Sequence, residues 1–348
     1  MAYTDIDKPT DYFNTVLYTG NGGTQSITGV GFQPDLVWMK SRSVAGAHHL
    51  VNDVVRGADK GIFTNLTTAE ITRGVSSFDS DGFSFDDNAG GDGNASGSSQ
   101  VAWNWKAGGT ASSNTNGSIT SSVSANQDAG FSIVSYTGDG TDGATVGHGL
   151  GVKPNMIILK PRNATNSWVV YHSTLGATKY LLLNTTAAAG TTADAWNNTE
   201  PTSSVFSIAT EAGGWNNHNG NNYIAYCFAE KKGYSKFGSY TGNNLDDGTF
   251  CYTGMKPSFV MIKRTDSTSE WNIYDVKRNP FNLTNLELEA NTSDAEANVS
   301  EREIDILSNG FKLRGRSTFI NAPGGSYINM AFAENPFVTS TGIPTTAR

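Results

Sequence analysis

The amino-acid sequence predicts an all-β protein of three tandem antiparallel β-sandwich modules, jelly-roll-like and of about 100 residues each. Composition is the first reason: the 348 residues include 39 Gly and only 16% charged residues, whereas long helices are usually rich in Ala, Glu, Lys and Leu. Short apolar runs bounded by Gly, Pro, Asn or Asp are the second reason, because they are typical of strands joined by tight turns. Internal repetition is the third.

One strand pattern, which begins at a glycine, occurs three times without gaps. The copies are residues 97–105, 220–228 and 324–332. In the middle copy Ile224, Tyr226 and Phe228 share one face, because side chains alternate along a strand, and we expect that face to be core. Cys227 lies on the opposite face, and its counterparts in the other copies are Asn and Ala. Cys227 is therefore predicted to be a small buried filler rather than a nucleophile.

A second pattern, Gly-x-x-Pro followed by an apolar run and a lysine, also occurs three times. The copies are residues 31–40, 151–160 and 254–263. Gly supplies a turn and Pro fixes φ without donating a ladder hydrogen bond, so the pattern predicts the entry to a strand. We expect the closing lysines, Lys40, Lys160 and Lys263, to end this strand in solvent.

The repeats divide the chain into modules, a linker and two arms. We place an N-terminal arm at 1–12, modules at 13–109, 129–233 and 234–337, a Gly/Ser/Thr linker at 110–128, and a C-terminal tail at 338–348. Ile119 and Val123 of the linker could pin a short extended piece onto a neighbouring sheet. We expect the arms to lie on neighbouring surfaces or to be mobile. The main helical candidate lies around residues 291–303.

Charge and hydropathy argue against several partners. Lys and Arg total 24 against 32 Asp and Glu, a formal net charge of -8 without a basic run, so we expect no nucleic-acid binding. No segment of the sequence approaches 18 consecutive apolar residues, so no membrane insertion is expected. The first residues, MAYTDIDKPTDYF, do not resemble a secretory signal, so we expect the protein to fold in a cytoplasm. Cys227 and Cys251 are therefore expected to be reduced thiols.

Catalytic and metal sites are each weaker hypotheses than packing or turns. The acidic segment 79–94 is rich in oxygen ligands, but it lacks EF-hand spacing, so we expect no metal site while leaving calcium open. His48 and His49 near Asp53 are typical of acid–base chemistry, yet His49 takes the place of a tryptophan in the other modules and is predicted to pack at a sheet edge. No pair of carboxylates recurs, and we expect neither an enzyme nor a bound cofactor.

Segments of the first two modules resemble virion structural and tail-fibre proteins of tailed bacteriophages, of the marine or cyanobacterial type. The similar segments are residues 101–109, 117–126, 129–138 and 145–154. The resemblance fades in the third module. It implies a virion protein, assembled in the host cytoplasm, with other phage virion proteins as partners. Fibres commonly trimerise, so it also implies a homo-oligomer, although three modules could mimic a trimer within one chain.

The function predicted on this basis is a tail fibre or receptor-binding protein that contacts host-surface polysaccharide. Residues 187–220 are rich in aromatic and amide side chains, and Trp196, Trp215, His218 and Asn219 are the candidate glycan-binding residues. His218 could equally cap a turn. The part of this loop that begins at Trp215 is expected to have no counterpart in the other modules. The alternatives are a capsid decoration protein (cement or head fibre) or tail-connecting protein that attaches through its N-terminal arm and, as a minor one, a glycan-degrading enzyme.

Overall fold

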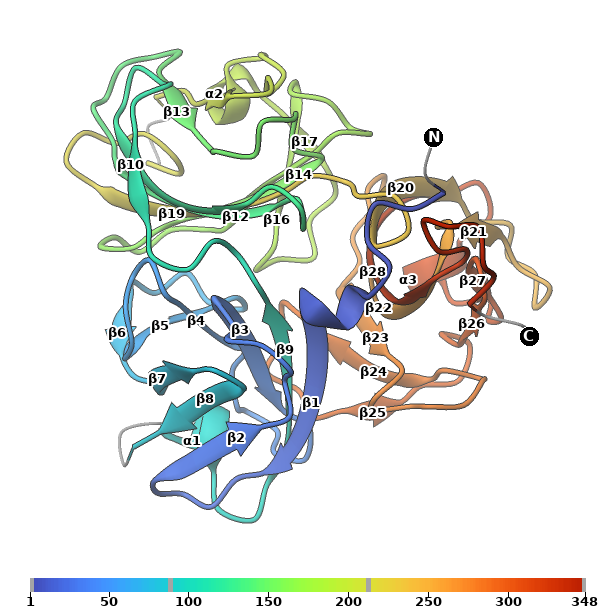
Figure 1. Ribbon diagram of the computed structural model, residues 1–348. Coiled ribbons are helices and arrows are strands. Elements are labelled where there is room, and N and C mark those ends of the chain that lie inside the picture. Colours follow the sequence, from blue (N-terminus) through green and yellow to red (C-terminus); the bar gives the residue numbers. More distant parts are fainter. Residues whose placement is uncertain (1–2, 87–89, 211–213, 346–348) are drawn as a thin grey trace.

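The protein is all-β, and its strands form three large sheets, two of which have a three-stranded and one a two-stranded partner sheet. The computed structural model describes residues 3–86, 90–210 and 214–345. Figure 1 shows three lobes around a common centre, one for each third of the sequence. We call the lobes the first, second and third units, formed by strands β1–β9, β10–β19 and β20–β28.

The first unit has a six-stranded sheet and a three-stranded sheet, and its paired strands are antiparallel. The order in the large sheet is β1 (Phe13–Thr19), β9 (Ser99–Trp105), β3 (Leu36–Ser41), β4 (Leu50–Asp53), β5 (Lys60–Phe63) and β6 (Ile71–Thr72). The small sheet is β2 (Gln25–Thr28), β8 (Gly82–Phe85) and β7 (Val75–Asp79). Two short helices belong to this part of the chain, the 3₁₀ turn η1 (Pro9–Asp11) and α1 (Gly90–Asn94).

The second unit has the same order, extended at one edge by two strands of the predicted linker. The large sheet runs β10 (Ser112–Asn114), β11 (Ser121–Asn126), β12 (Phe131–Thr137), β19 (Asn222–Phe228), β14 (Met156–Pro161), β15 (Val169–His172), β16 (Lys179–Leu182) and β17 (Gly190–Thr191). The small sheet is β13 (Thr145–Gly147) with β18 (Val205–Ser207), and α2 is Ala193–Trp196. Ile119 and Val123 are buried in this unit, as expected of residues that pin the linker to a sheet.

The third unit repeats the order of the first. The large sheet runs β20 (Ser235–Thr241), β28 (Ser326–Pro336), β22 (Met255–Arg264), β23 (Trp271–Asp275), β24 (Leu286–Glu289) and β25 (Ala297–Asn298). The small sheet is β21 (Phe250–Tyr252), β27 (Gly310–Leu313) and β26 (Ile304–Leu307), and α3 is Thr318–Asn321. Helices α1 to α3 have four or five residues each, and no helix in the described part of the chain is long and apolar enough to cross a membrane.

The helix expected around residues 291–303 does not form, and that prediction is wrong. The segment contains turns and the short strand β25, which pairs with β24 through Leu286 and Asn298. Contacts with the first unit hold it extended, since the backbone N–H of Glu296 donates to the carbonyl of Arg42 at 2.8 Å. Tertiary hydrogen bonds therefore override a local preference that is worth only a few tenths of a kcal/mol per residue.

The closing strands β9, β19 and β28 bury both of their faces. The small residues, such as Ala102, Cys227 and Ala331, face a core inside their own unit. The large residues on the opposite face belong to one core shared by all three units. The expectation that Ile224, Tyr226 and Phe228 are core is confirmed, and Cys227 is the predicted buried filler. Sequence alone did not indicate that the large faces pack against other units.

Three aromatic rings meet at the centre of this shared core. Trp105, Phe228 and Phe332 occupy the same position in the three closing strands, each paired with the corresponding residue of the neighbouring strand. Their ring centroids lie 5.6, 6.0 and 6.4 Å apart, in edge-to-face arrangements. Such geometry is favourable for aromatic pairs, and it joins the three units at one point.

The second repeated pattern forms the predicted turn and strand, but its lysines are not in solvent. Gly31, Gly151 and Gly254 have φ of 88°, 72° and 73°, a region that favours glycine. Lys40, Lys160 and Lys263, by contrast, are fully buried, so the expected exposure is wrong.

The buried lysine ammonium groups bond to backbone carbonyls instead of water. Lys160 Nζ donates to the carbonyls of Thr67, in the first unit, and of Asn166, at 3.0 and 2.7 Å. Lys263 Nζ donates to the carbonyls of Thr186, in the second unit, and of Ser269, at 3.0 and 2.8 Å. Lys160 and Lys263 thus reach across the boundary with the neighbouring unit, whereas Lys40 Nζ donates to the carbonyl of Ser41 in its own unit at 2.8 Å. Burial lowers the pKa of Lys160 to about 7 and the pKa of Lys263 to about 8.

The N-terminal arm lies on its own chain. Ile6 is buried in the shared core, and the backbone N–H of Asp5 donates to the carbonyl of Lys232 at 2.9 Å. The C-terminal tail meets the arm, because the backbone N–H and the hydroxyl of Ser340 both donate to the carboxylate of Asp7. The described parts of both ends are thus fastened to neighbouring surfaces.

The lowered pKa of Lys160 predicts that stability depends on pH. The unfolded chain keeps this lysine protonated up to a pKa near 10.5, whereas the native protein releases the proton above about 7. The unfolded state therefore binds more protons above pH 7, and the free energy of unfolding should rise with pH by up to about 1.4 kcal/mol per unit. Urea unfolding at pH 7.0 and 8.5 should give a steeper rise for the wild type than for Lys160→Met. Equal rises would contradict the assignment.

Candidate functional site

Three of the four candidate glycan-binding residues lie on one loop at the surface of the second unit. Trp215 is half-buried, and its ring lies 4.8 Å from that of Tyr180 on β16, tilted by 47°. His218 and Asn219 are exposed. The backbone N–H of His218 donates to the hydroxyl of Tyr223 at 2.8 Å, which holds the loop against β19. The loop thus offers an aromatic ring, an imidazole and an amide on a fixed backbone.

Trp196, the fourth candidate, lies in the core beneath this loop. It ends helix α2, its side chain is only 1% exposed, and it packs edge-to-face on Tyr171 with ring centroids 5.8 Å apart. The side-chain amide of Asn216 donates to the carbonyl of Ala195, which ties the loop to the helix. The structure therefore brings Trp215, His218 and Asn219 together at the surface and places Trp196 below them as support.

Part of this loop does have counterparts in the other units, contrary to expectation. The Asn217 side-chain amide donates to the carbonyl of Thr141 at 2.7 Å and accepts the backbone N–H of Asp139 at 3.0 Å. Asn94 and Asn321 make the same two kinds of bond in the first and third units. The sequence held the signal, because each asparagine stands three residues before the glycine that begins a closing strand. What is particular to the second unit is the set of outward side chains.

Both thiols and His49 are buried and engaged in packing or hydrogen bonds. Burial raises the pKa of the Cys227 and Cys251 thiols, so neither is a ready thiolate. His49 is fully buried, stacks on Trp103 with centroids 6.2 Å apart, and accepts the indole N–H of Trp38 at 3.0 Å. Burial also lowers the pKa of His49. His49 therefore serves in packing.

The acidic segment uses its described carboxylates within the fold. Asp79 accepts the hydroxyls of Ser77 and Ser84, and Asp81 accepts two backbone N–H groups from the turn after β2. Asp92 pairs with Arg73 at 2.8 Å. Residues 87–89 of this segment lie outside the described part. Among residues 3–86, 90–210 and 214–345, no group of three or more His, Cys, Asp or Glu side chains is arranged to hold a metal ion.

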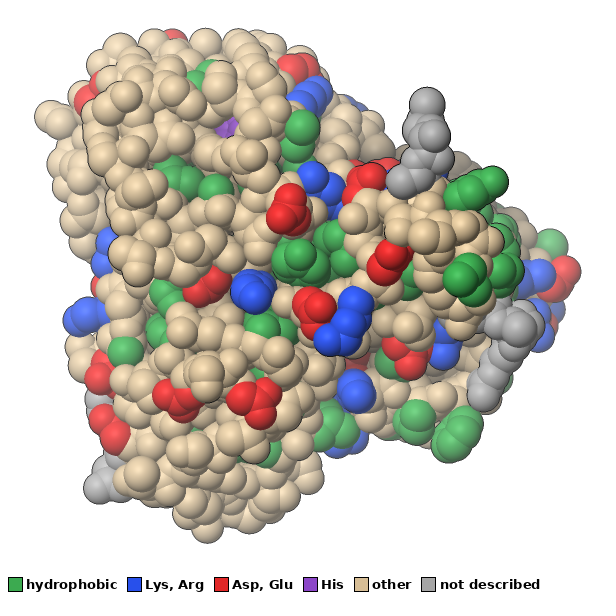
Figure 2. Space-filling view, in the orientation of Figure 1, with side chains coloured by type: hydrophobic (Ala, Val, Ile, Leu, Met, Phe, Trp, Pro, Cys, Tyr) green, Lys and Arg blue, Asp and Glu red, His purple; other side chains and the backbone are tan. Residues whose placement is uncertain are grey.

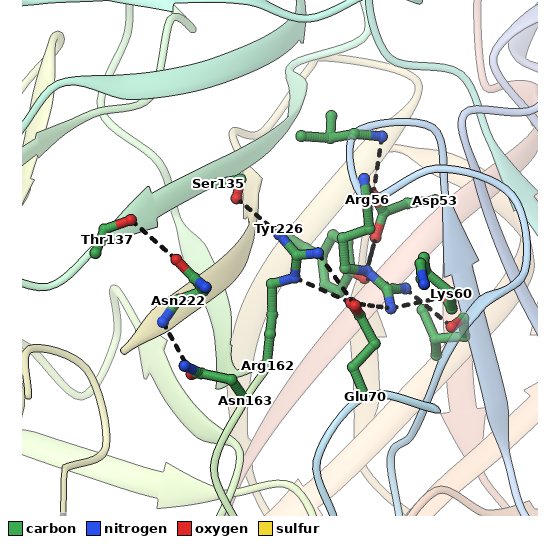
Figure 3. Close-up of polar contacts among 12 residues, drawn as sticks. Asp53, Arg56, Lys60, Glu70, Ser135, Thr137, Arg162, Asn163, Asn222 and Tyr226 are labelled. Atoms are coloured by element: carbon green, nitrogen blue, oxygen red, sulfur yellow. Dashed lines mark hydrogen bonds and ion pairs between the residues drawn. The ribbon is translucent and has the colours of Figure 1, made fainter. Parts of the chain in front are cut away.

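A buried ionic network joins the first unit to the second, and sequence reasoning missed it. Asp53 and Arg56 form an ion pair at 2.5 Å with both side chains fully buried, and the hydroxyl of Tyr226 in the second unit donates to Asp53 at 2.7 Å. Arg56 also contacts Glu70 at 3.4 Å, and Glu70 accepts two bonds from Arg162 of the second unit at 2.9 and 3.1 Å. Figure 3 shows these side chains converging from both units.

The third unit meets the first through the same arrangement. Asp275 and Arg278 form a fully buried pair at 2.5 Å, and the indole N–H of Trp103 donates to Asp275 at 3.0 Å. Arg278 contacts Glu296 at 3.0 Å, and Glu296 accepts two bonds from Arg42 of the first unit at 3.0 and 2.7 Å. The repeated Asp-Val-x-Arg sequence at 53–56 and 275–278 is the signal that could have identified both networks.

The junction between the second and third units lacks these charges. In the second unit, His172 takes the place of Asp53, Leu175 that of Arg56 and Ala189 that of Glu70. In the third unit, Thr265 takes the place of Arg162. The backbone confirms the equivalence of the last two positions, because Ala189 N–H donates to Thr265 O at 2.9 Å, as Glu70 N–H does to Arg162 O at 2.7 Å.

A pocket of about 420 Å³ opens at this third junction. Its lining includes Leu175 and Lys179 from the second unit and Ser239, Tyr240 and Asp266 from the third. Hydroxyl groups dominate the remaining lining. This junction pocket is a second candidate site beside the Trp215 loop.

The junction networks predict a stability difference between two variants. Asp53→Asn leaves the Arg56 guanidinium buried without its full counter-charge, which should lower the free energy of unfolding by about 3–5 kcal/mol. Asp53→His combined with Arg56→Leu introduces the residues found at the junction between the second and third units. Because it removes both charges together, it should lower the free energy of unfolding clearly less than Asp53→Asn does. Urea unfolding of both variants gives the comparison. A double variant as unstable as Asp53→Asn would contradict this account.

Comparison with known proteins identifies one family. No curated protein and no solved structure is significantly similar to this chain. A family described as "Domain of unknown function (DUF7483)" matches residues 8–336, which include all three units. Since that match covers far more than half of the 348 residues, the chain belongs to the DUF7483 family.

Proposed function

We propose that this protein is a non-enzymatic structural protein on the exterior of a bacteriophage particle, a tail fibre or receptor-binding protein that contacts host-surface polysaccharide. The similarity of residues 101–109, 117–126, 129–138 and 145–154 to tailed-phage virion proteins supports a place on the phage particle. The all-β architecture with tethered loops supports a rigid exterior part. In this proposal each large sheet and its small sheet form one jelly-roll-like module, and the three modules act as a trimer within one chain.

The observation that carries the proposal is the loop of Trp215, His218 and Asn219. A half-buried ring beside Tyr180 provides a flat apolar surface on which a sugar ring can stack, while the exposed imidazole and amide can hydrogen-bond its hydroxyls. Asn217 and Tyr223 fix the backbone before any ligand arrives. Binding to such a loop costs little ordering entropy, which favours recognition.

Two of the histidines, His148 and His172, are poor candidates for a general base. Burial lowers the pKa of His148 and of His172 to about 4, so both are neutral and enclosed at pH 7. Both thiols are also enclosed. A general base must reach its substrate, which these groups do not.

A capsid decoration or tail-connecting protein is the second candidate, and the surface of the third unit favours it. Large apolar side chains are exposed there, with Tyr252 at 63% and Phe281 at 75%. Figure 2 shows hydrophobic patches on the lobe at the right of the view, which is the third unit. Apolar surface of this kind suits contact with other virion proteins.

Trp215→Ala should weaken adsorption of particles to host cells, and binding of the purified protein to host polysaccharide, by up to about tenfold, since an aromatic contact contributes about 0.5–1.5 kcal/mol. Tyr252→Ala, an exposed aromatic on another unit, is the matched control and should adsorb normally. If Trp215→Ala particles adsorb as the wild type does while Tyr252→Ala is lost from particles, the structural role replaces receptor binding.

A further inference from the structure

The third junction differs from the other two in what fills it. At the first, Arg162 extends over Glu70 toward Ser135 on β12, with its Nη1 at 3.4 Å from that hydroxyl. Ser239 on β20 is the counterpart of Ser135, by its place opposite Ile328 as Ser135 is opposite Ile224. Thr265 in place of Arg162 and Leu175 in place of Arg56 both line the 420 Å³ pocket, as does Ser239.

The lining of this pocket is polar but balanced in charge. Lys179 supplies one exposed ammonium and Asp266 one carboxylate. A hydrogen bond from Arg264 at 2.7 Å lowers the pKa of Asp266 and keeps it ionised. An anionic ligand would meet Asp266, and a second ammonium would meet Lys179, so neither charge suits the pocket as a whole.

Hydroxyl groups and one apolar wall complete the lining. Ser239, Thr241 and Thr174 line the opening and are exposed, and Leu175 forms an apolar wall. The Tyr240 side chain points away from Ser239, into the core of the third unit, where its ring packs on Phe311 and Tyr327 and its hydroxyl donates to the carbonyl of Ile320. Hydroxyls both donate and accept, which matches a ligand that carries many hydroxyls and one less polar face.

We propose that the pocket between the second and third units binds a short neutral saccharide, at a site separate from the Trp215 loop. Its volume lies at the lower end of the roughly 300–1,000 Å³ range of small-molecule pockets. The saccharide lies beside Thr265 and Leu175, which stand where the other two junctions carry arginines. The ligand class rests on the proposed glycan recognition, while the location rests on the comparison of the junctions.

The other junctions supply the variant that tests this site. Ala189→Glu with Thr265→Arg rebuilds the Glu70–Arg162 pair in the pocket and should fill it. Saturation-transfer NMR of the full chain with glucose, galactose, mannose, N-acetylglucosamine, lactose and maltose is the assay, with glucosamine and N-acetylneuraminic acid as charged probes. The assay uses a Trp215→Ala background, so that the loop does not contribute sugar binding. There we expect transfer to at least one neutral sugar, reduced by about tenfold or more when the filled variant is combined with that background.

Ser239→Tyr, on an exposed edge strand, blocks the opening without touching the core and gives a second reading if the filled variant does not fold. In the Trp215→Ala background, transfer that survives in both blocked variants, transfer to charged probes alone, or no transfer to any sugar would overturn the pocket proposal. Transfer lost in Trp215→Ala but kept in the blocked variants would overturn the pocket and leave the proposed function in place. Host adsorption of Trp215→Ala particles tests the proposed function and not the pocket.

Discussion

The packing of Trp105, Phe228 and Phe332 at the centre of the molecule is the interaction on which the rest of the structure depends. Each ring comes from a different unit, and each closing strand that carries one is buried on both faces. A single unit can cover the small-residue face with its own small sheet, but the large-residue face is covered only by the other two units. Burial of apolar surface is the main favourable contribution to folding, so the units depend on one another for a large share of it.

The pairing of charged side chains at the junctions follows from that shared burial. Side chains that reach the boundary between units leave water, and buried charges are tolerated when they are paired and hydrogen-bonded. The first and third units solve this with Asp–Arg–Glu chains that end on Arg162 and Arg42. The second unit uses His172, Leu175 and Ala189 instead, and the space left there is open and polar. The scaffold is nearly symmetric, and the junction without an Asp–Arg–Glu chain thereby differs from the other two.

The sequence predicted the candidate loop better than it predicted the roles within it. Trp215, His218 and Asn219 lie together at the surface because they are close in sequence and precede a strand whose position the repeat defines. Trp196 seemed equivalent by composition, yet helix α2 turns it into the core, where it packs on Tyr171. The junction residues were missed altogether, because Asp53 and Tyr226, or Trp103 and Asp275, lie more than a hundred residues apart in the chain.

The sequence by itself determined the all-β class, the repeated strands and turns, and which residues alternate between the two faces of the closing strands. Those properties are local, since glycine conformation, the missing N–H of proline and side-chain alternation act over a few residues. Only the tertiary structure decided that the large faces form one core for three units, that Lys40, Lys160 and Lys263 are buried, and that residues 291–303 are not helical. These outcomes depend on contacts between distant segments, and the chain acquires such contacts only when its units come together.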